Sequence, residues 1–146
     1  MIQRIQSLFL LLAAGSYGSL FGLPFVTSDS LAEGFFSNKS FEILDHMVLT
    51  GLVIAGAFFA VLAIFLFRNR KAQVLLSYLS LLTGLVFLPG TGYYFLSNEL
   101  PEQTGISELN ISAGLFIPVV IAVLVLLAIR YIKKDDKLVR SMDRLR

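Results

Sequence analysis

Few side chains in this sequence have types and spacings that suggest reactive chemistry. Glu42, Asp45 and His46 form the only group that combines carboxylates with an imidazole over a short stretch of sequence. Carboxylates and imidazole are metal ligands and acid–base groups, so such a group could hold a metal ion or move a proton. The spacing is specific for neither. We favour a structural role in which Asp45 caps a following helix and His46 lies at a membrane interface.

Composition narrows the remaining chemistry. The 146 residues include no cysteine and a single histidine. These counts exclude disulfides, thiolate metal sites and cysteine nucleophiles, and they argue against haem ligation. The net charge is +2, and the basic residues flank apolar stretches, where they serve membrane orientation better than nucleic-acid binding. We therefore predict no catalytic residue, no cofactor, no metal ion and no nucleic-acid partner.

The elements that must position these residues are unusually apolar. Hydrophobic residues make up 56% of the chain and charged residues 15%, whereas about a quarter is charged in soluble domains. Each of four uncharged stretches reaches the roughly 20 residues that cross a bilayer. We predict an all-α membrane protein whose single four-helix transmembrane domain, residues 1–146, has spans at about 5–26, 47–67, 72–96 and 110–130. The alternative that the first stretch is a cleaved signal is disfavoured, because its apolar run continues to Val26.

The charges predict how the chain is threaded. Eleven of the 12 Lys and Arg residues lie in residues 1–4, 68–71 and 130–146. By the positive-inside rule, both termini are cytoplasmic and the connections at 27–46 and 97–110 are external. Residues 130–146 predict a basic amphipathic helix, which could lie on lipid headgroups, dock on a partner, or simply extend the last span into solvent.

Small and helix-breaking residues predict how the spans pack. Ala14/Gly18/Gly22, Gly51/Ala55 and Gly56/Ala60 place small residues four apart, which favours close packing of spans one and two. Pro89 predicts a kink or an early end in span three, with a freed carbonyl that a nearby hydroxyl such as Thr83 could satisfy. The interfacial aromatic belt is the favoured place for four tyrosines: Tyr17, Tyr93, Tyr94 and Tyr131. No ionisable residue lies deep in a span, which argues against proton relays and ion-coupled transport.

Three segments carry a resemblance to a known family: Met1-Ile-Gln-Arg-Ile-Gln6, residues 67–73 (Phe-Arg-Asn-Arg-Lys-Ala-Gln) and the tail 132–146. Together they resemble a bacterial family of uncharacterised four-span inner-membrane proteins, classed as a domain of unknown function. The resemblance implies a multi-pass protein of the bacterial inner membrane and brings no assigned activity. From the same segments we predict one cytoplasmic interaction surface. It comprises Gln3, Arg4, Gln6, Asn69, Arg70, Gln73, Asp136, Arg140, Asp143 and Arg144.

These features favour a non-enzymatic membrane protein: a small subunit, adaptor or assembly factor of an inner-membrane complex. Its expected partners are membrane lipids and another membrane protein or a second copy of the chain. The alternative is a small transporter or a lipid- or quinone-binding protein that uses the broken third helix around Pro89, which requires a cavity at membrane depth lined by that break and by hydroxyls of span three. A membrane enzyme is a third hypothesis, with Asp45 and His46 or the tail aspartates as its candidate groups.

Overall fold

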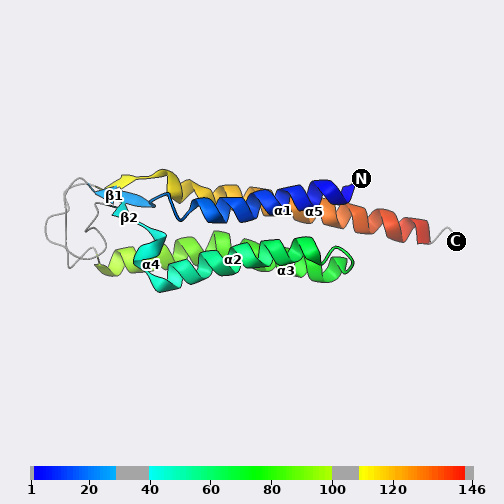
Figure 1. Ribbon diagram of the computed structural model, residues 1–146, viewed down its shortest axis with the longest axis horizontal. Helices are drawn as coiled ribbons and strands as arrows, with labels where there is room; N and C mark the ends of the chain where they lie inside the picture. The colour runs from blue at the N-terminus through cyan, green and yellow to red at the C-terminus, as the bar shows by residue number, and fades with distance from the viewer. Residues whose placement is uncertain (1, 29–39, 100–108, 144–146) are drawn as a thin grey trace.

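The computed structural model describes residues 2–28, 40–99 and 109–143 (Figure 1). The α-helices in these ranges are α1 (Ile2–Ser19), α2 (Met47–Phe65), α3 (Arg70–Leu82), α4 (Leu88–Glu99) and α5 (Ile117–Asp143). A π-helical segment, η2 (Thr83–Phe87), joins α3 to α4 in one continuous rod. The strands are β1 (Val26–Ser28), β2 (Ser40–Phe41) and β3 (Leu109–Ile111). Short 3-10 helices, η1 (Ile43–Asp45) and η4 (Ala113–Phe116), precede α2 and α5.

Three helical stretches are long and apolar enough to cross a membrane. They are Met47–Phe65, Arg70–Phe95 and Ala113–Ser141, with mean hydropathies of 2.6, 1.7 and 2.7. Large apolar side chains on these helices face outward, and Phe58 and Phe65 are 56% and 70% exposed. Such surfaces suit a lipid environment, because hydrocarbon solvates them without the cost that water imposes. The all-α class is therefore confirmed, and the helices are those of a membrane protein.

The first predicted span, residues 5–26, is helical over only part of its length. α1 ends at Ser19, and its apolar part, Ile5–Ser19, is shorter than the three stretches that are long enough to cross a membrane. The amides of residues 20–22 donate to carbonyls three residues earlier at 3.2–3.3 Å, which tightens and ends the helix. Pro24 has no amide donor with which to continue it. The chain then turns into β1.

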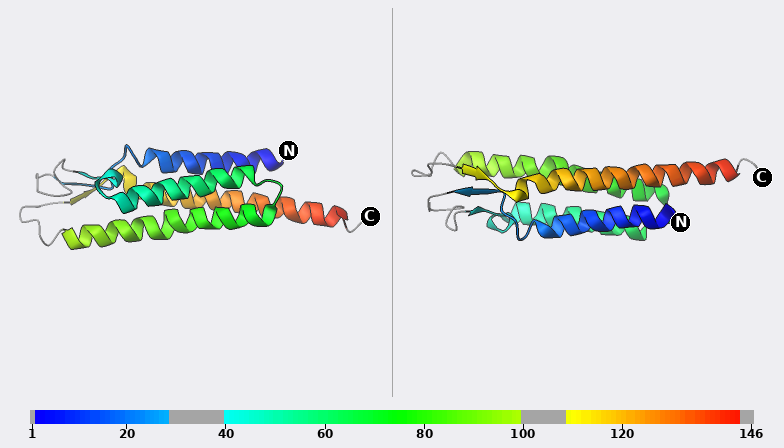
Figure 2. Two further views of the ribbon diagram at one scale, coloured as in Figure 1. Left: turned by 60° about the horizontal axis from the view of Figure 1, so that its bottom comes forward. Right: turned by 90° about the horizontal axis from the view of Figure 1, so that it is seen from above.

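The helices pack lengthwise around a shared core (Figures 1 and 2). α1 packs against α2 and α5, and α3 packs against the same two helices, so α1 and α3 are diagonal neighbours. The N-terminus, the turn between α2 and α3 and the end of α5 lie together at one end, which we call the Arg70 end. The three strands lie at the opposite end, which we call the sheet end.

Two matching core stripes line the interior of the packed helices. The stripe on α1 consists of Gln6, Leu10, Ala13 and Tyr17. The stripe on α3 and η2 consists of Gln73, Ser77, Ser80 and Gly84. In each stripe the later members follow the first by four, seven and eleven residues, which is the spacing of one helix face. Because both helices start at the Arg70 end, residues at the same position in the two stripes lie at similar depths.

α1 and α2 pack together, but mostly not through the predicted small residues. Gly18, Gly22 and Gly51 are exposed, and a Cβ on Gly18 or Gly51 would meet nothing within 4 Å. Of the predicted pairs, only Gly56/Ala60 is fully buried. A helix interface made of Ala14, Gly18 and Gly22 is therefore wrong, because that face of α1 points away from the core.

The third helical rod changes its winding before Pro89 and does not end there. In η2 the Leu88 amide donates to the Thr83 carbonyl, five residues earlier, and the helix then continues as α4. Such π segments absorb an irregularity within a helix and are frequent at functional sites. The Thr83 hydroxyl donates to the Leu79 carbonyl at 2.8 Å, so it does not satisfy a carbonyl freed by the proline. The expected early end at Pro89 is thus wrong.

The small sheet joins the two connections at the sheet end. β1 is its central strand and pairs antiparallel with β2 on one side and with β3 on the other. Val26 stands opposite Phe41 in the first pairing and opposite Ile111 in the second. The sequence of residues 36–41 is compatible with a hairpin turn or with a short interfacial helical turn, and apart from β2 this segment lies outside the described residues.

Candidate functional site

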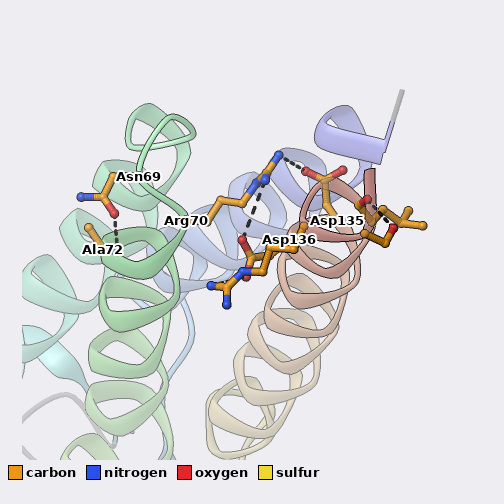
Figure 3. Close-up of polar contacts among 8 residues, drawn as sticks. Asn69, Arg70, Ala72, Asp135 and Asp136 are labelled. Atoms are coloured by element: carbon orange, nitrogen blue, oxygen red, sulfur yellow. Dashed lines mark hydrogen bonds and ion pairs between the residues drawn. The ribbon is translucent and has the colours of Figure 1, made fainter. Parts of the chain in front are cut away.

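Arg70 joins the start of α3 to the end of α5 (Figure 3). Its Nη2 lies 2.9 Å from Asp135 Oδ2, and its Nη1 lies 3.8 Å from Asp136 Oδ1. Asp136 also pairs with Arg140 one turn further along, at 2.9 Å. The contact with Asp135 is ionic, since its Oδ2 meets no donor at hydrogen-bonding geometry. We call Arg70, Asp135, Asp136 and Arg140 the Arg70 cluster.

The Arg70 cluster holds α5 at the point where this helix leaves the other helices. The Arg70 and Asp135 side chains are only 23% and 16% exposed, so solvent screens their attraction less than that of a surface pair. One turn earlier, Lys133 Nζ donates to the Tyr78 hydroxyl at 2.8 Å. Beyond the cluster α5 continues past its neighbours (Figure 1). We call residues 134–143, which include the α5 members of the cluster and the turns beyond them, the α5 arm.

The structure brings together three of the ten predicted surface residues: Arg70, Asp136 and Arg140. Asn69 is exposed nearby and caps α3, since its Oδ1 accepts a hydrogen bond from the Ala72 amide at 3.2 Å. Of the remaining six residues, Gln6 and Gln73 are described with their side chains. For Gln3, Arg4 and Asp143 only the backbone is described, and Arg144 lies outside the described residues.

Gln6 and Gln73 lie in the core and not on the predicted surface. They are 2% and 0% exposed, and each is the first member of its core stripe, so they lie at similar depths near the Arg70 end. Gln6 Oε1 and both polar atoms of the Gln73 side chain have no hydrogen-bond partner. A buried polar group without a partner costs about 1–3 kcal/mol. Their place in the stripe, and not their polarity, decides their burial.

Tyr17 crosses the core from α1 to α3 and is fully buried, so its predicted interfacial position is wrong. Its hydroxyl donates to the Ser80 carbonyl at 2.6 Å, and the Ser80 hydroxyl donates to the Gly56 carbonyl of α2 at 3.0 Å. The Tyr17 ring lies against Gly56 and Gly84, where any Cβ would overlap it. Tyr17 thereby links three helices, and the glycines make room for its ring.

Glu42, Asp45 and His46 build a turn at the sheet end. The Glu42 amide donates to Asp45 Oδ2 at 2.6 Å, within a capping box around η1. His46 caps α2 by accepting a hydrogen bond from the Val48 amide at 3.2 Å, so the predicted capping of α2 by Asp45 is wrong. Burial raises the pKa of the Asp45 carboxyl, the hydrogen bond from Glu42 N–H opposes this rise, and the Glu42 charge adds to it. Among the described residues, no three His, Cys, Asp or Glu side chains are placed to hold a metal ion.

A cavity of about 210 Å³ lies at the sheet end, beside Pro89. Its lining residues come from the sheet, from α4 and from the start of α5: Phe25, Val26, Phe41, Leu88, Pro89, Gly92, Tyr93, Leu115 and Pro118. Among them only Tyr93 has a polar side-chain group. The hydroxyls expected to line such a cavity are elsewhere, since Ser77, Ser80 and Thr83 bond to backbone carbonyls in the helical core. The cavity therefore suits an apolar ligand better than a polar one.

Comparison with known families settles the resemblance suggested by the sequence. The family model described as domain of unknown function DUF4293 matches residues 2–145, which is nearly the whole chain. The chain belongs to the DUF4293 family. No curated protein and no solved structure matches this DUF4293 protein. The resemblance to a family of unknown function is thus confirmed.

Sequence reasoning missed two important residues of this DUF4293 protein. Asp135 is the principal partner of Arg70, and it continues the buried face of α5 that includes Ala128 and Ile132. Extending that periodicity by one turn would have placed Asp135 toward the other helices. Tyr17 follows Gln6 by eleven residues, so the same reasoning would have placed it on the buried face of α1.

Proposed function

We propose that this DUF4293 protein is a non-enzymatic membrane adaptor or small subunit that docks on another membrane protein through the α5 arm. The observation that carries the proposal is the Arg70 cluster, which holds α5 against α3 at the point where α5 extends past the other helices. A flexible tail would lose conformational entropy on binding, whereas an arm already held in place loses less. A restrained arm therefore suits stable assembly.

In this proposal the chain crosses the bacterial inner membrane four times, with α1 as the shortest span and the Arg70 end in the cytoplasm. The support is the charge distribution, since 11 of the 12 Lys and Arg residues belong to segments at that end. The α5 arm would then stand at the cytoplasmic face, in reach of the cytoplasmic parts of a membrane protein.

The side chains of the α5 arm indicate what its partner would offer. Lys134 and Lys137 are exposed, and Leu138, which is next to Lys137 and one turn after Lys134, is 44% exposed. An apolar patch on the partner with acidic residues at its rim complements this surface, because rim charges steer association while apolar contact supplies affinity. The Lys137 side chain makes no ion pair among the described residues, which leaves it available to such a partner.

Co-purification from the native membrane tests the proposal. The full-length tagged chain is extracted in a mild detergent, and proteins that accompany it are identified and quantified by mass spectrometry. We expect a stoichiometric membrane protein that is lost from Lys137→Glu. Lys71→Glu is the matched control, because Lys71 is an exposed basic residue at the same end but lies on α3. Equal recovery with both variants, or no stoichiometric partner with the unaltered chain, contradicts docking through the arm.

A specific observation favours a second candidate function, the binding of a lipid or quinone. The cavity beside Pro89 is apolar and lies in the part of the structure where the third helix changes its winding. A transport function has less support, because the polar groups of the core stripes lie in packed interior and not along the cavity.

A further inference from the structure

We propose that the cavity at the sheet end binds one acyl chain of a membrane phospholipid, with the glycerol region of the lipid near Tyr93. This inference rests on the second candidate function and is independent of docking through the α5 arm. It assigns the site, the chemical class of ligand and the part of the ligand that is held.

The cavity walls favour hydrocarbon over water. Phe25, Phe41 and Leu88 are at most 5% exposed and form its closed side. A water molecule needs two or more polar partners in a cavity, and these side chains offer none. Apolar cavities of about 150 Å³ stay dry and accept molecules such as benzene. The 210 Å³ at the sheet end therefore has room for several methylene groups.

The shortness of α1 accounts for the space. α1 ends at Ser19, so at the depth of Pro89 no helical turn of α1 stands between α2 and α5. Phe25 and Phe41, beside and within the sheet, line the cavity, and the centroids of their rings lie 6.3 Å apart. Helix α4 packs against α2, and the cavity lies between α4, the sheet and the start of α5.

The cavity is apolar inside and has one polar group, the Tyr93 hydroxyl, at its mouth, as a phospholipid has apolar chains and polar ester groups. Tyr93 and Leu115 are 74% and 39% exposed at its edge. Leu88 follows Arg70 by 18 residues, or about 27 Å along a helix, close to the roughly 30 Å thickness of membrane hydrocarbon. The cavity thus lies where acyl chains meet their ester groups, and a tyrosine hydroxyl is well suited to that boundary. We assign the site to a phospholipid, whose ester carbonyls lie at this boundary and can accept a hydrogen bond from the Tyr93 hydroxyl.

Two glycines of α4 provide a matched pair of variants. A Cβ on Gly90 or on Gly92 would meet nothing within 4 Å, so a side chain can start from either position without a clash at its first carbon. Gly92 lines the cavity, whereas Gly90 borders a more open depression with Val86 and Tyr94. Gly92→Leu would fill the cavity, and Gly90→Leu would leave it open. Both substitutions replace glycine by a better helix former, so their effects on α4 itself are alike.

Photolabelling in vesicles tests the site directly. The full-length chain is reconstituted with phosphatidylethanolamine and phosphatidylglycerol plus a phosphatidylglycerol that carries a diazirine on one acyl chain, and labelled peptides are mapped by mass spectrometry. We expect labels at residues 88–93 and 115–118. Gly92→Leu should reduce them about tenfold or more, since each excluded methylene removes about a fourfold factor in affinity. Gly90→Leu should leave them unchanged.

Two results would overturn the assignment. Equal labelling of both variants would show that the lipid contacts an open surface and does not enter the cavity. The second result would come from native mass spectrometry of the chain extracted from its own membrane. If the chain retains an isoprenoid quinone and no phospholipid, the cavity does not bind a phospholipid chain. The adaptor proposal is judged separately, because Gly92→Leu should leave recovery of a partner through the α5 arm unaltered.

Discussion

At the residue scale, Tyr17 determines how closely three helices approach one another. Its ring occupies the space that Gly56 and Gly84 leave open, and its hydroxyl reaches the backbone of α3. Hydrogen bonds between helices in a membrane contribute modestly, about 0.6 kcal/mol on average. The shape of the pocket around the ring therefore matters more than the hydrogen bond.

A methyl group at Gly56 should disturb this packing. We expect Gly56→Ala to lower the stability by about 1–3 kcal/mol, because a Cβ there overlaps the Tyr17 ring in a filled core. Thermal unfolding in detergent, followed by circular dichroism, measures the change. Gly51→Ala on the same helix is the control, since its Cβ meets no atom within 4 Å. Equal melting temperatures for the two variants would contradict the role of Gly56.

Gln73 leads to a prediction of the opposite sign. Its buried side-chain amide has no partner, so Gln73→Met, which keeps the size of the side chain, should be neutral or stabilising by up to about 1–3 kcal/mol. Chemical or thermal unfolding of the detergent-solubilised chain provides the measurement. A clear loss of stability would mean that the amide is satisfied in the membrane, for example by water shared with Gln6.

At the element scale, the Arg70 cluster determines how firmly the α5 arm is held. Arg70→Ala removes the partner of a carboxylate whose side chain is only 16% exposed, so the arm should separate more often from α3. We expect faster hydrogen exchange of the amides of residues 134–141, measured by mass spectrometry.

The neighbouring residue offers the control for this prediction. Lys71 is exposed and makes no ion pair among the described residues, so Lys71→Ala should leave the exchange of the arm unchanged. Restoring the pair with reversed charges, Arg70→Asp together with Asp135→Arg, should slow the exchange again. Equal exchange in Arg70→Ala and the unaltered chain would show that the arm does not depend on the cluster.

Several elements were predictable from apolar length and charge, and others were not. The three long apolar helical stretches follow from uncharged stretches of the sequence, and α2 begins at Met47 as predicted. The end of α1 at Ser19 was not predicted, because the apolar sequence continues to Val26. The backbone nevertheless leaves the α-helix after Ser19, where the amides of residues 20–22 bond three residues back. The π segment was missed for a related reason: Pro89 signals an irregularity but does not specify how the helix absorbs it.

The candidate site was predictable only in part. Polarity brought Arg70, Asp136 and Arg140 together, as the ion pairs show, since each is charged and flanks an apolar stretch. Polarity misplaced Gln6 and Gln73, which the helix periodicity puts in the core. The cavity beside Pro89 depends on where α1 ends and where the sheet closes over it, and neither is visible in the local sequence.

At the scale of the whole molecule, the proposed threading, with the Arg70 end in the cytoplasm, gives a direct prediction. The sequence has no cysteine, so single cysteines can be introduced without background. In intact bacterial cells with a permeabilised outer membrane, a membrane-impermeant maleimide should label Asn110→Cys at the sheet end and not Ser141→Cys on the arm. Both positions are exposed in the structure. Labelling of Ser141→Cys alone would reverse the proposed orientation, and labelling of both would contradict it.

The pairing of β1 with β3, and of α1 with α5, bears on the order in which the protein can be completed. α1 packs against α5, which follows it far along the chain, and the central strand β1 pairs with β3 more than eighty residues later. Until β3 has been made, the small sheet lacks one edge strand, and until α5 has been made, α1 lacks one of its two neighbours. The packing of α1 therefore waits for α5, and a chain truncated before Ile117 would leave α1 without this neighbour.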